Sequence, residues 1–237
     1  MSTLKAISSM ATRHVLAELV AAAHEAGHPD VEIESVGGVD AADRVAAGEA
    51  FDLVFLAQGA LNKLADAGHV EKSTVAPLLL SQVAVAVPSD STDPAARPSG
   101  TAYGSADGVR DALRAAKRIG YSTGPSGTAL VKMIDDWGLS DELGDRLVQA
   151  RPGVPVARSL ADGEVDLGFQ QLSELVGQQG VRILGVLPDD CAIDTVFSGA
   201  VAAASADPEL AGGLLAYLQS GDAAEVKARH VFGVPSA

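Results

Sequence analysis

The chain is poor in cysteine, in aromatic residues and in basic residues. Cys191 is the single cysteine among 237 residues, so neither an intramolecular disulfide nor a cluster of thiolate metal ligands can form. Lysine and arginine number 17 against 31 aspartate and glutamate residues. The resulting net charge of −14 argues against nucleic acid or an anionic membrane as a partner. No segment approaches the ~18 consecutive apolar residues of a membrane-spanning helix.

Sequence motifs of the common cofactor sites are missing as well. The chain contains no GxGxxG, GxxxxGK(S/T) or GxSxG pattern. His24 and His28 stand four residues apart, but Gly27 and Pro29 put them at a helix end, where an imidazole commonly interacts with the helix dipole. We therefore expect no cofactor and no metal site.

The residues that are abundant predict a soluble α/β protein. Hydrophobic residues make up 47% of the chain and aromatic residues only 4%, so the core must consist mainly of Ala, Val and Leu. The length allows one large or two modest α/β domains. No basic or apolar leader precedes the first predicted strand, Leu4–Ser8. The chain as written is therefore expected in the cytoplasm, and in the periplasm or outside the cell if a leader has been removed.

One sequence pattern occurs twice, at Ala46–Leu61 and at Leu160–Leu175. Each copy reads as a helix end, Gly-Glu, Asp, an apolar strand, Gln and a new helix, with Phe51 as one inserted residue in the first copy. Asp52 and Asp166 precede the two strands, and we expect them to cap turns or to accept hydrogen bonds from backbone N–H groups. The repeat predicts two similar lobes.

The order of the predicted elements divides the chain between these lobes. The first lobe begins as βαβαβα, which favours a parallel sheet with right-handed crossovers. In it Asp40 is expected to cap a helix that runs to Ala47. In the second lobe a strand at Val165–Phe169 is followed by a polar turn at Gln170-Gln171. The terminal helices return to the first lobe, which predicts lobes 1–82 plus 192–237 and 83–191, joined by a hinge of two crossing strands.

Three Gly- and Ser-rich turns at strand-to-helix junctions predict an anion site. Helix N-termini leave backbone N–H groups free, and Gly or Ser lets a ligand approach them closely. A Gln side chain at a strand end adds uncharged donors and an acceptor, and Arg13 could pair with a carboxylate. The predicted ligand-binding residues are Ser8, Ser9, Met10, Arg13, Gly37, Gly38, Val39, Gln58, Ser126, Gly127, Thr128, Gln170 and Gln171.

The same turns offer few groups that could transfer a proton. A base is required if the protein is an enzyme acting beside a carboxylate. His14, Asp40 and Glu174 are the candidates that the sequence places near the predicted turns.

Four segments resemble the molybdate-binding branch of the solute-binding proteins of ABC transporters. They are ISSMATRHVLAEL, GEAFDLVFLAQGALNKLADAGHV, YSTGPSGTALVKMIDDWG and ADGEVDLGFQQLSEL. The resemblance implies a type II periplasmic-binding-protein fold, with two α/β lobes that close on a ligand. It also implies a tetrahedral oxyanion held by Ser hydroxyls and backbone N–H groups, with Ser8, Ser9 and Ser126-Gly127 matching in type.

Two departures from that family leave the ligand open. The second turn has Gly37-Gly38-Val39-Asp40 where the transport proteins present a Ser, and Gln170-Gln171 replaces their late Tyr. Similar proteins include aconitate isomerases, which act on a tricarboxylic acid. We therefore expect a receptor for a small oxyanion or organic carboxylate, partnered by an ABC permease if it is exported. The alternative is a cytoplasmic, cofactor-independent isomerase or lyase of an unsaturated carboxylic acid.

Overall fold

The chain folds into two compact units, each with its own sheet and core. The structure is a computed structural model that describes residues 3–92, 100–151, 153–233 and 235. Unit 1 comprises Met1–Leu80 and Val196–Ala237, and unit 2 comprises Ser81–Thr195. The strands β4 (Ala76–Pro88) and β9 (Asp194–Val201) carry the chain from one unit to the other. These are the two crossing strands of the predicted α/β fold.

The sheet of unit 1 has the strand order β2-β1-β3-β9. The central strand β1 (Leu4–Ser9) pairs in parallel with β2 (Val31–Val36) and with β3 (Leu53–Ala57), whereas β3 and β9 are antiparallel. The carboxyl ends of β1, β2 and β3 therefore lie at the same edge of this sheet. Each of these strands leads directly into a helix or helical turn at that edge.

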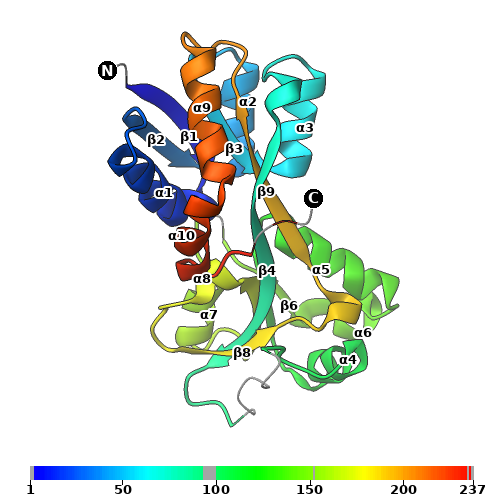
Figure 1. Ribbon diagram of the computed structural model, residues 1–237. Coiled ribbons are helices and arrows are strands. Elements are labelled where there is room, and N and C mark those ends of the chain that lie inside the picture. Colours follow the sequence, from blue (N-terminus) through cyan, green and yellow to red (C-terminus); the bar gives the residue numbers. More distant parts are fainter. Residues whose placement is uncertain (1–2, 93–99, 152, 234, 236–237) are drawn as a thin grey trace. The chain divides into compact units, whose positions relative to one another are not determined.

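Helices cover both faces of the unit 1 sheet (Figure 1). One face carries α1 (Arg13–Glu25), α9 (Pro208–Gln219) and α10 (Ala224–Arg229), and the other carries α2 (Gly38–Ala46) and α3 (Gln58–Asp66). Adjacent residues of a strand point to opposite faces, which is why the sheet supplies both cores.

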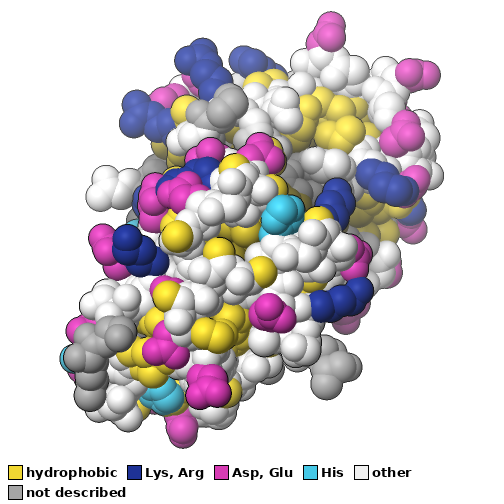
Figure 2. Space-filling model, turned by 90° about the horizontal axis from the view of Figure 1, so that it is seen from above, with side chains coloured by type: hydrophobic (Ala, Val, Ile, Leu, Met, Phe, Trp, Pro, Cys, Tyr) yellow, Lys and Arg dark blue, Asp and Glu magenta, His cyan; other side chains and the backbone are white. Residues whose placement is uncertain are grey.

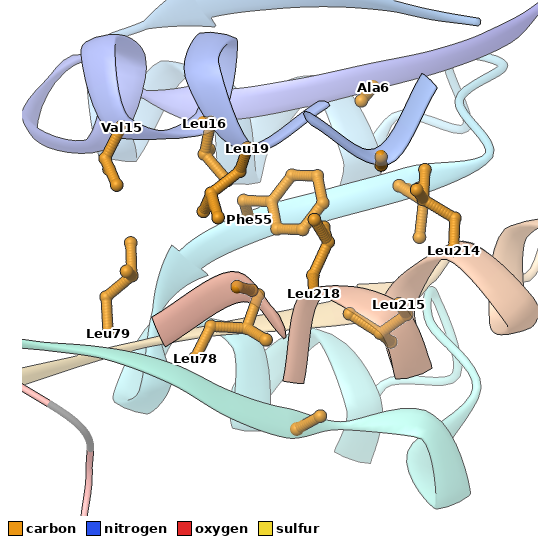
Figure 3. Packing of buried hydrophobic residues seen from close by; sticks show 14 of the residues in the cluster. Ala6, Val15, Leu16, Leu19, Phe55, Leu78, Leu79, Leu214, Leu215 and Leu218 are labelled. Atoms are coloured by element: carbon orange, nitrogen blue, oxygen red, sulfur yellow. The ribbon is translucent and has the colours of Figure 1, made fainter. Parts of the chain in front are cut away.

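The larger core of unit 1 joins the first and last parts of the sequence. Figure 3 shows the Phe55 ring between Leu16 and Leu19 of α1 and Leu218 of α9. All four side chains are at most 2% exposed. With few aromatic residues available, Leu side chains from α1, β4 and α9 fill most of this space.

Unit 2 contains a mixed sheet in which β4 lies between β7 and β8. Strand β4 pairs antiparallel with β7 and with β8, and β5 pairs in parallel with β7 and β6. The remaining strands are β5 (Ile119–Tyr121), β6 (Leu147–Gln149), β7 (Leu167–Gln171) and β8 (Val181–Val186). The helices are α4 (Ala106–Ala115), α5 (Pro125–Asp136), α6 (Ser140–Leu143), α7 (Val156–Ala161) and α8 (Leu172–Leu175).

Two glycines let α7 pack tightly on the unit 2 sheet. Gly120 of β5 and Gly168 of β7 are partners in register. A Cβ atom on Gly168 would lie 2.8 Å from Cγ1 of Val156, and one on Gly120 would lie 3.0 Å from the same atom. The absence of both side chains brings the first residue of α7 down onto β7.

Several element boundaries differ from those expected. Gln170 and Gln171 belong to strand β7 and not to a polar turn. Asp40 does not cap α2, because the helix begins two residues earlier with Gly37 as its N-cap. Likewise α3 begins at Gln58 and α5 at Pro125, so the predicted turns form the first turns of these helices.

The molecular surface is charged and mixed in sign. Figure 2 shows acidic and basic side chains dispersed among polar and hydrophobic ones on the face it presents. No helix in the described ranges is both long and apolar enough to cross a membrane.

Candidate ligand-binding site

The helix starts that follow β1, β2 and β3 have no side-chain caps. Ser9, Gly37 and Ala57 are the N-cap residues of a short 3₁₀ turn, of α2 and of α3, and no side-chain hydrogen bond caps any of them in the described chain. By contrast, Asp207 caps α9 by accepting from the backbone N–H of Leu210. The first N–H groups of α2 and α3 are therefore free to bind an external acceptor.

Ser8 and Ser9 are adjacent in β1 but have different environments. The Ser8 hydroxyl is paired with that of Ser35 at 2.8 Å. The Ser9 hydroxyl is enclosed and has no hydrogen-bond partner among the described residues. Gly38 lies beside it, since a Cβ atom on Gly38 would be 3.7 Å from that of Ser9. Ser9 thus places an unused donor next to the uncapped start of α2.

The other predicted residues of unit 1 differ in their exposure. Two apolar side chains, Met10 and Val39, are 45% and 77% exposed. Arg13 is exposed and donates through Nε to His14 Nε2 at 3.0 Å. Gln58 is partly buried in the first turn of α3, and its side chain makes no hydrogen bond to any described residue. Arg13 and Gln58 remain available to a ligand.

In unit 2 the first turn of α5 approaches the preceding loop closely. Ser126 is buried, and its hydroxyl is 2.9 Å from that of Ser122. A Cβ atom on Gly127 would lie only 1.8 Å from the Ser122 carbonyl oxygen, so only glycine fits there. Thr128 is exposed and donates weakly, at 3.4 Å, to the carbonyl oxygen of the N-cap Gly124. The first N–H groups of α5 lack a side-chain cap.

Gln170 is occupied by two partners within unit 2. Its Oε1 accepts from the backbone N–H of Val156 at 2.8 Å, at the start of α7. Its Nε2 donates to the Glu174 carboxylate. This amide therefore serves α7 and Glu174, and has little left to offer a ligand.

Gln171 is as buried as Gln170, but only one end of its side-chain amide makes a hydrogen bond. Its Oε1 accepts from the Ser81 hydroxyl at 2.9 Å. Its Nε2 makes no hydrogen bond within the described part of the chain. Of the two glutamines, Gln171 is the one with a donor to spare.

The three candidate proton-transfer groups differ in environment. His14 and Asp40 are exposed, whereas Glu174 is partly buried. Burial raises the pKa of the Glu174 carboxyl, and the hydrogen bond donated by Gln170 offsets only part of that rise. A carboxyl with a raised pKa can accept and return a proton at a higher pH than an ordinary one.

Two further serines were absent from the predicted set. The hydroxyls of Ser173 in α8 and Ser198 in β9 are enclosed and have no partner among the described residues, as for Ser9. Nothing in the sequence distinguishes a serine whose hydroxyl lacks a partner from one that is paired.

The described residues do not form a metal site. Within residues 3–92, 100–151, 153–233 and 235, no group of three His, Cys, Asp or Glu side chains could hold a metal ion. His24 pairs instead with Asp30, and the ring of His28 lies 4.7 Å from that of Tyr217.

Comparison with known proteins identifies the family. The family model for bacterial extracellular solute-binding proteins matches residues 4–232. An aconitate isomerase from Pseudomonas sp is 34% identical over 183 residues, which are 77% of this chain and 67% of that protein.

Solved structures confirm the predicted type II fold. The periplasmic molybdate-binding protein of Azotobacter vinelandii superposes with a TM-score of 0.76 at 19% identity, over 98% of this chain and 100% of that one. A substrate-binding domain assigned to a molybdenum ABC transporter of Clostridium difficile gives 0.78 at 16% identity, over 99% of both chains. The chain belongs to the bacterial extracellular solute-binding protein family.

Proposed function

We propose that this solute-binding protein is a receptor for a small anion, held by uncharged donors at the helix starts of unit 1. The observation that carries the proposal is the Ser9 hydroxyl, which is enclosed without a partner beside the uncapped start of α2. A buried hydroxyl without a partner is costly, so such groups usually mark a ligand or a water.

The chemistry of these donors suits an anion even in a protein of charge −14. Backbone N–H groups at a helix start carry partial positive charge and point at the bound group. Such hydrogen bonds are stronger where water is excluded. Within unit 2, Ser126 and the free Nε2 of Gln171 are uncharged donors of the same kind.

Thermal-shift and calorimetric titration against molybdate, tungstate, sulfate, and di- and tricarboxylates tests this function. We expect at least one anion to bind with micromolar affinity without being altered. Replacing Ser9 by Ala should weaken that affinity about tenfold or more, since hydrogen bonds to charged groups are worth about 1.5–3 kcal/mol. Ser159, a buried serine that donates to Glu164, offers a matched control whose Ala variant should keep the affinity. Absence of stabilisation by every anion would refute the proposal.

A second candidate is a cofactor-independent isomerase of an unsaturated carboxylic acid. The aconitate isomerase relative and the environment of Glu174 favour it. The Glu174 carboxylate would take a proton from the carbon beside a substrate carboxylate. Backbone N–H groups would hold the developing enediolate. The Glu174 carboxyl, after exchanging its proton with solvent, would then protonate the far end of the allylic system.

Deuterium exchange separates the enzyme from the receptor. In D₂O an isomerase incorporates solvent deuterium into aconitate, which NMR detects, and the rate should rise with pH as Glu174 loses its proton. Replacing Glu174 by Gln should abolish exchange but preserve binding, while His14→Gln and Asp40→Asn should retain exchange. Lack of exchange in a panel of unsaturated acids would rule the enzyme out.

The two roles also require different partners and locations. A receptor must meet an ABC permease outside the cytoplasm, whereas the enzyme needs no partner and can act in the cytoplasm. Cell fractionation of the native host distinguishes these cases.

A further inference from the structure

Ser198 carries an unused hydrogen-bonding group in the interior of unit 1. The residue lies in β9, is 1% exposed, and its hydroxyl is enclosed without a partner among the described residues. Buried hydroxyls are nearly always satisfied by protein, ligand or water, so this one calls for an explanation.

Ser198 lies level with Ser9 across the sheet. In the β3–β9 pairing Ser198 stands opposite Leu56. In the β1–β3 pairing Ser8 stands opposite Phe55, so the next residues, Ser9 and Leu56, are also level. Ser9, Leu56 and Ser198 therefore form one row across three strands, near the carboxyl ends of β1 and β3.

The members of this row also share one face of the sheet. Cross-strand partners point to the same face and alternate residues repeat it. Ile7, Leu56 and Ala200 all belong to the core beneath α2 and α3. Ser9 lies two residues from Ile7, and Ser198 two residues from Ala200. Both free hydroxyls thus project toward the side of the sheet on which α2 and α3 begin.

The spacing of the row indicates how long a shared ligand must be. Ser9 in β1 and Ser198 in β9 are two strand spacings apart, because β3 lies between them. At about 4.8 Å for each spacing, the two residues are about 9.6 Å from each other. Two hydrogen bonds of about 2.8 Å then leave about 4 Å between the two acceptor oxygens. The oxygens of a tetrahedral oxyanion surround a single atom, whereas two carboxylates on a carbon chain reach such a separation readily.

We propose that Ser198 is a ligand-binding residue that, together with Ser9, selects an extended acid with two or more carboxylates over a tetrahedral oxyanion. The inference rests on the anion-binding function proposed above and narrows it to a ligand class.

The test compares affinity and intrinsic stability in the same variants. Ser198→Ala, Ser198→Cys and the control Ser159→Ala are titrated with citrate, cis-aconitate and tricarballylate, and with molybdate and sulfate. Wild-type protein should prefer the tricarboxylates. Ser198→Ala and Ser198→Cys should each weaken their binding about tenfold or more, through loss of a hydrogen bond to a charged group. Any binding of molybdate or sulfate should be unchanged.

Stability without ligand distinguishes a ligand contact from a structural one. Ser198→Ala should leave the thermal midpoint of the free protein unchanged or higher, because it removes a polar group that had no partner. Ser159→Ala should lower the midpoint and leave tricarboxylate affinity intact, because that serine is bonded to Glu164.

Each contrary result has a separate meaning. If the wild type binds no anion at all, the proposed function fails and this inference fails with it. If tricarboxylates bind equally well to wild type and both Ser198 variants, or if only the oxyanions bind, this inference alone is overturned. A lowered midpoint with unchanged affinity would identify a buried water as the partner of Ser198, and would likewise overturn it.

Discussion

The two copies of the repeated sequence pattern have the same structure before the strand and different structures after it. Before each strand the aspartate has the same role. Asp52 accepts from the backbone N–H of Lys5 at 2.9 Å, and Asp166 accepts from that of Lys117 at 3.0 Å. This confirms the expectation that both bind backbone N–H groups. After the strand the copies diverge: β3 ends before Gln58, which opens the nine-residue α3, whereas β7 continues through its glutamines into a four-residue helix.

The comparison teaches that local sequence determines the start of the strand, and tertiary contacts determine its end. The aspartate finds backbone N–H partners in the neighbouring strand in unit 1 and just before the neighbouring strand in unit 2. Gln170 stays in the buried strand because the backbone N–H of Val156 and the carboxylate of Glu174 bind the two ends of its amide. Gln58 has no such partners within the described residues, so the chain turns into a helix there.

The largest difference in stability should be that between alanine variants of Gly127, at the start of α5, and of Gly38, at the start of α2. Gly127→Ala should lower the free energy of unfolding by about 3 kcal/mol, because its Cβ would clash with the Ser122 carbonyl oxygen. Gly38→Ala should change it by no more than about 1 kcal/mol, since the nearest atom to that Cβ is 3.7 Å away. Urea denaturation followed by circular dichroism measures both. Equal losses would show that the two helix starts are equally constrained.

A smaller difference in stability is expected between alanine variants of Gln170 and of Gln58. Gln170→Ala should cost about 1–3 kcal/mol, because the Val156 N–H and the Glu174 carboxylate lose their partner. Gln58→Ala should alter stability by no more than about 0.5 kcal/mol, as is usual where no contact is lost. If Gln58→Ala were instead the more destabilising variant in thermal unfolding, the assignment of Gln170 to a structural role would be wrong.

The smallest effect concerns pH and the two aspartates. Burial works to raise the pKa of Asp52, but hydrogen bonds from Lys5, Ser205 and Ala206 outweigh it, so the pKa is lowered. A lowered pKa contributes stability above the ordinary value of about 4, which disappears as pH falls through the folded-state value.

Asp52→Asn should therefore flatten the loss of thermal stability on the acid side. The wild-type and variant midpoints should converge toward low pH, and Asp166→Asn provides the matched comparison. A constant difference between wild type and Asp52→Asn at every pH would contradict the lowered pKa.

The sequence predicted the fold well because apolar periodicity and the repeat are local signals. It placed the starts of α2 and α5 a few residues late, since Gly37 and Gly124 replace the polar caps by which a helix start is normally recognised. Asp40 was therefore taken for a cap although it lies inside α2.

The candidate site was predicted less completely, because the tertiary structure decides whether a polar group has a hydrogen-bond partner. The sequence grouped Gln170 with Gln171, and only the fold shows that the first is fully engaged while the second retains a donor. Ser198 looks like any serine in a strand until its lack of a partner is known.

The way β4 and β9 connect the units has a consequence for synthesis on the ribosome. Unit 2 is one continuous segment, Ser81–Thr195, and has fully emerged before unit 1 has all of its sequence. Until Leu214, Leu215 and Leu218 are translated, the face of the nascent sheet around Phe55 has no α9 to cover it. We therefore expect the inserted segment to fold first, with the early apolar strands shielded by chaperones until the last helices arrive.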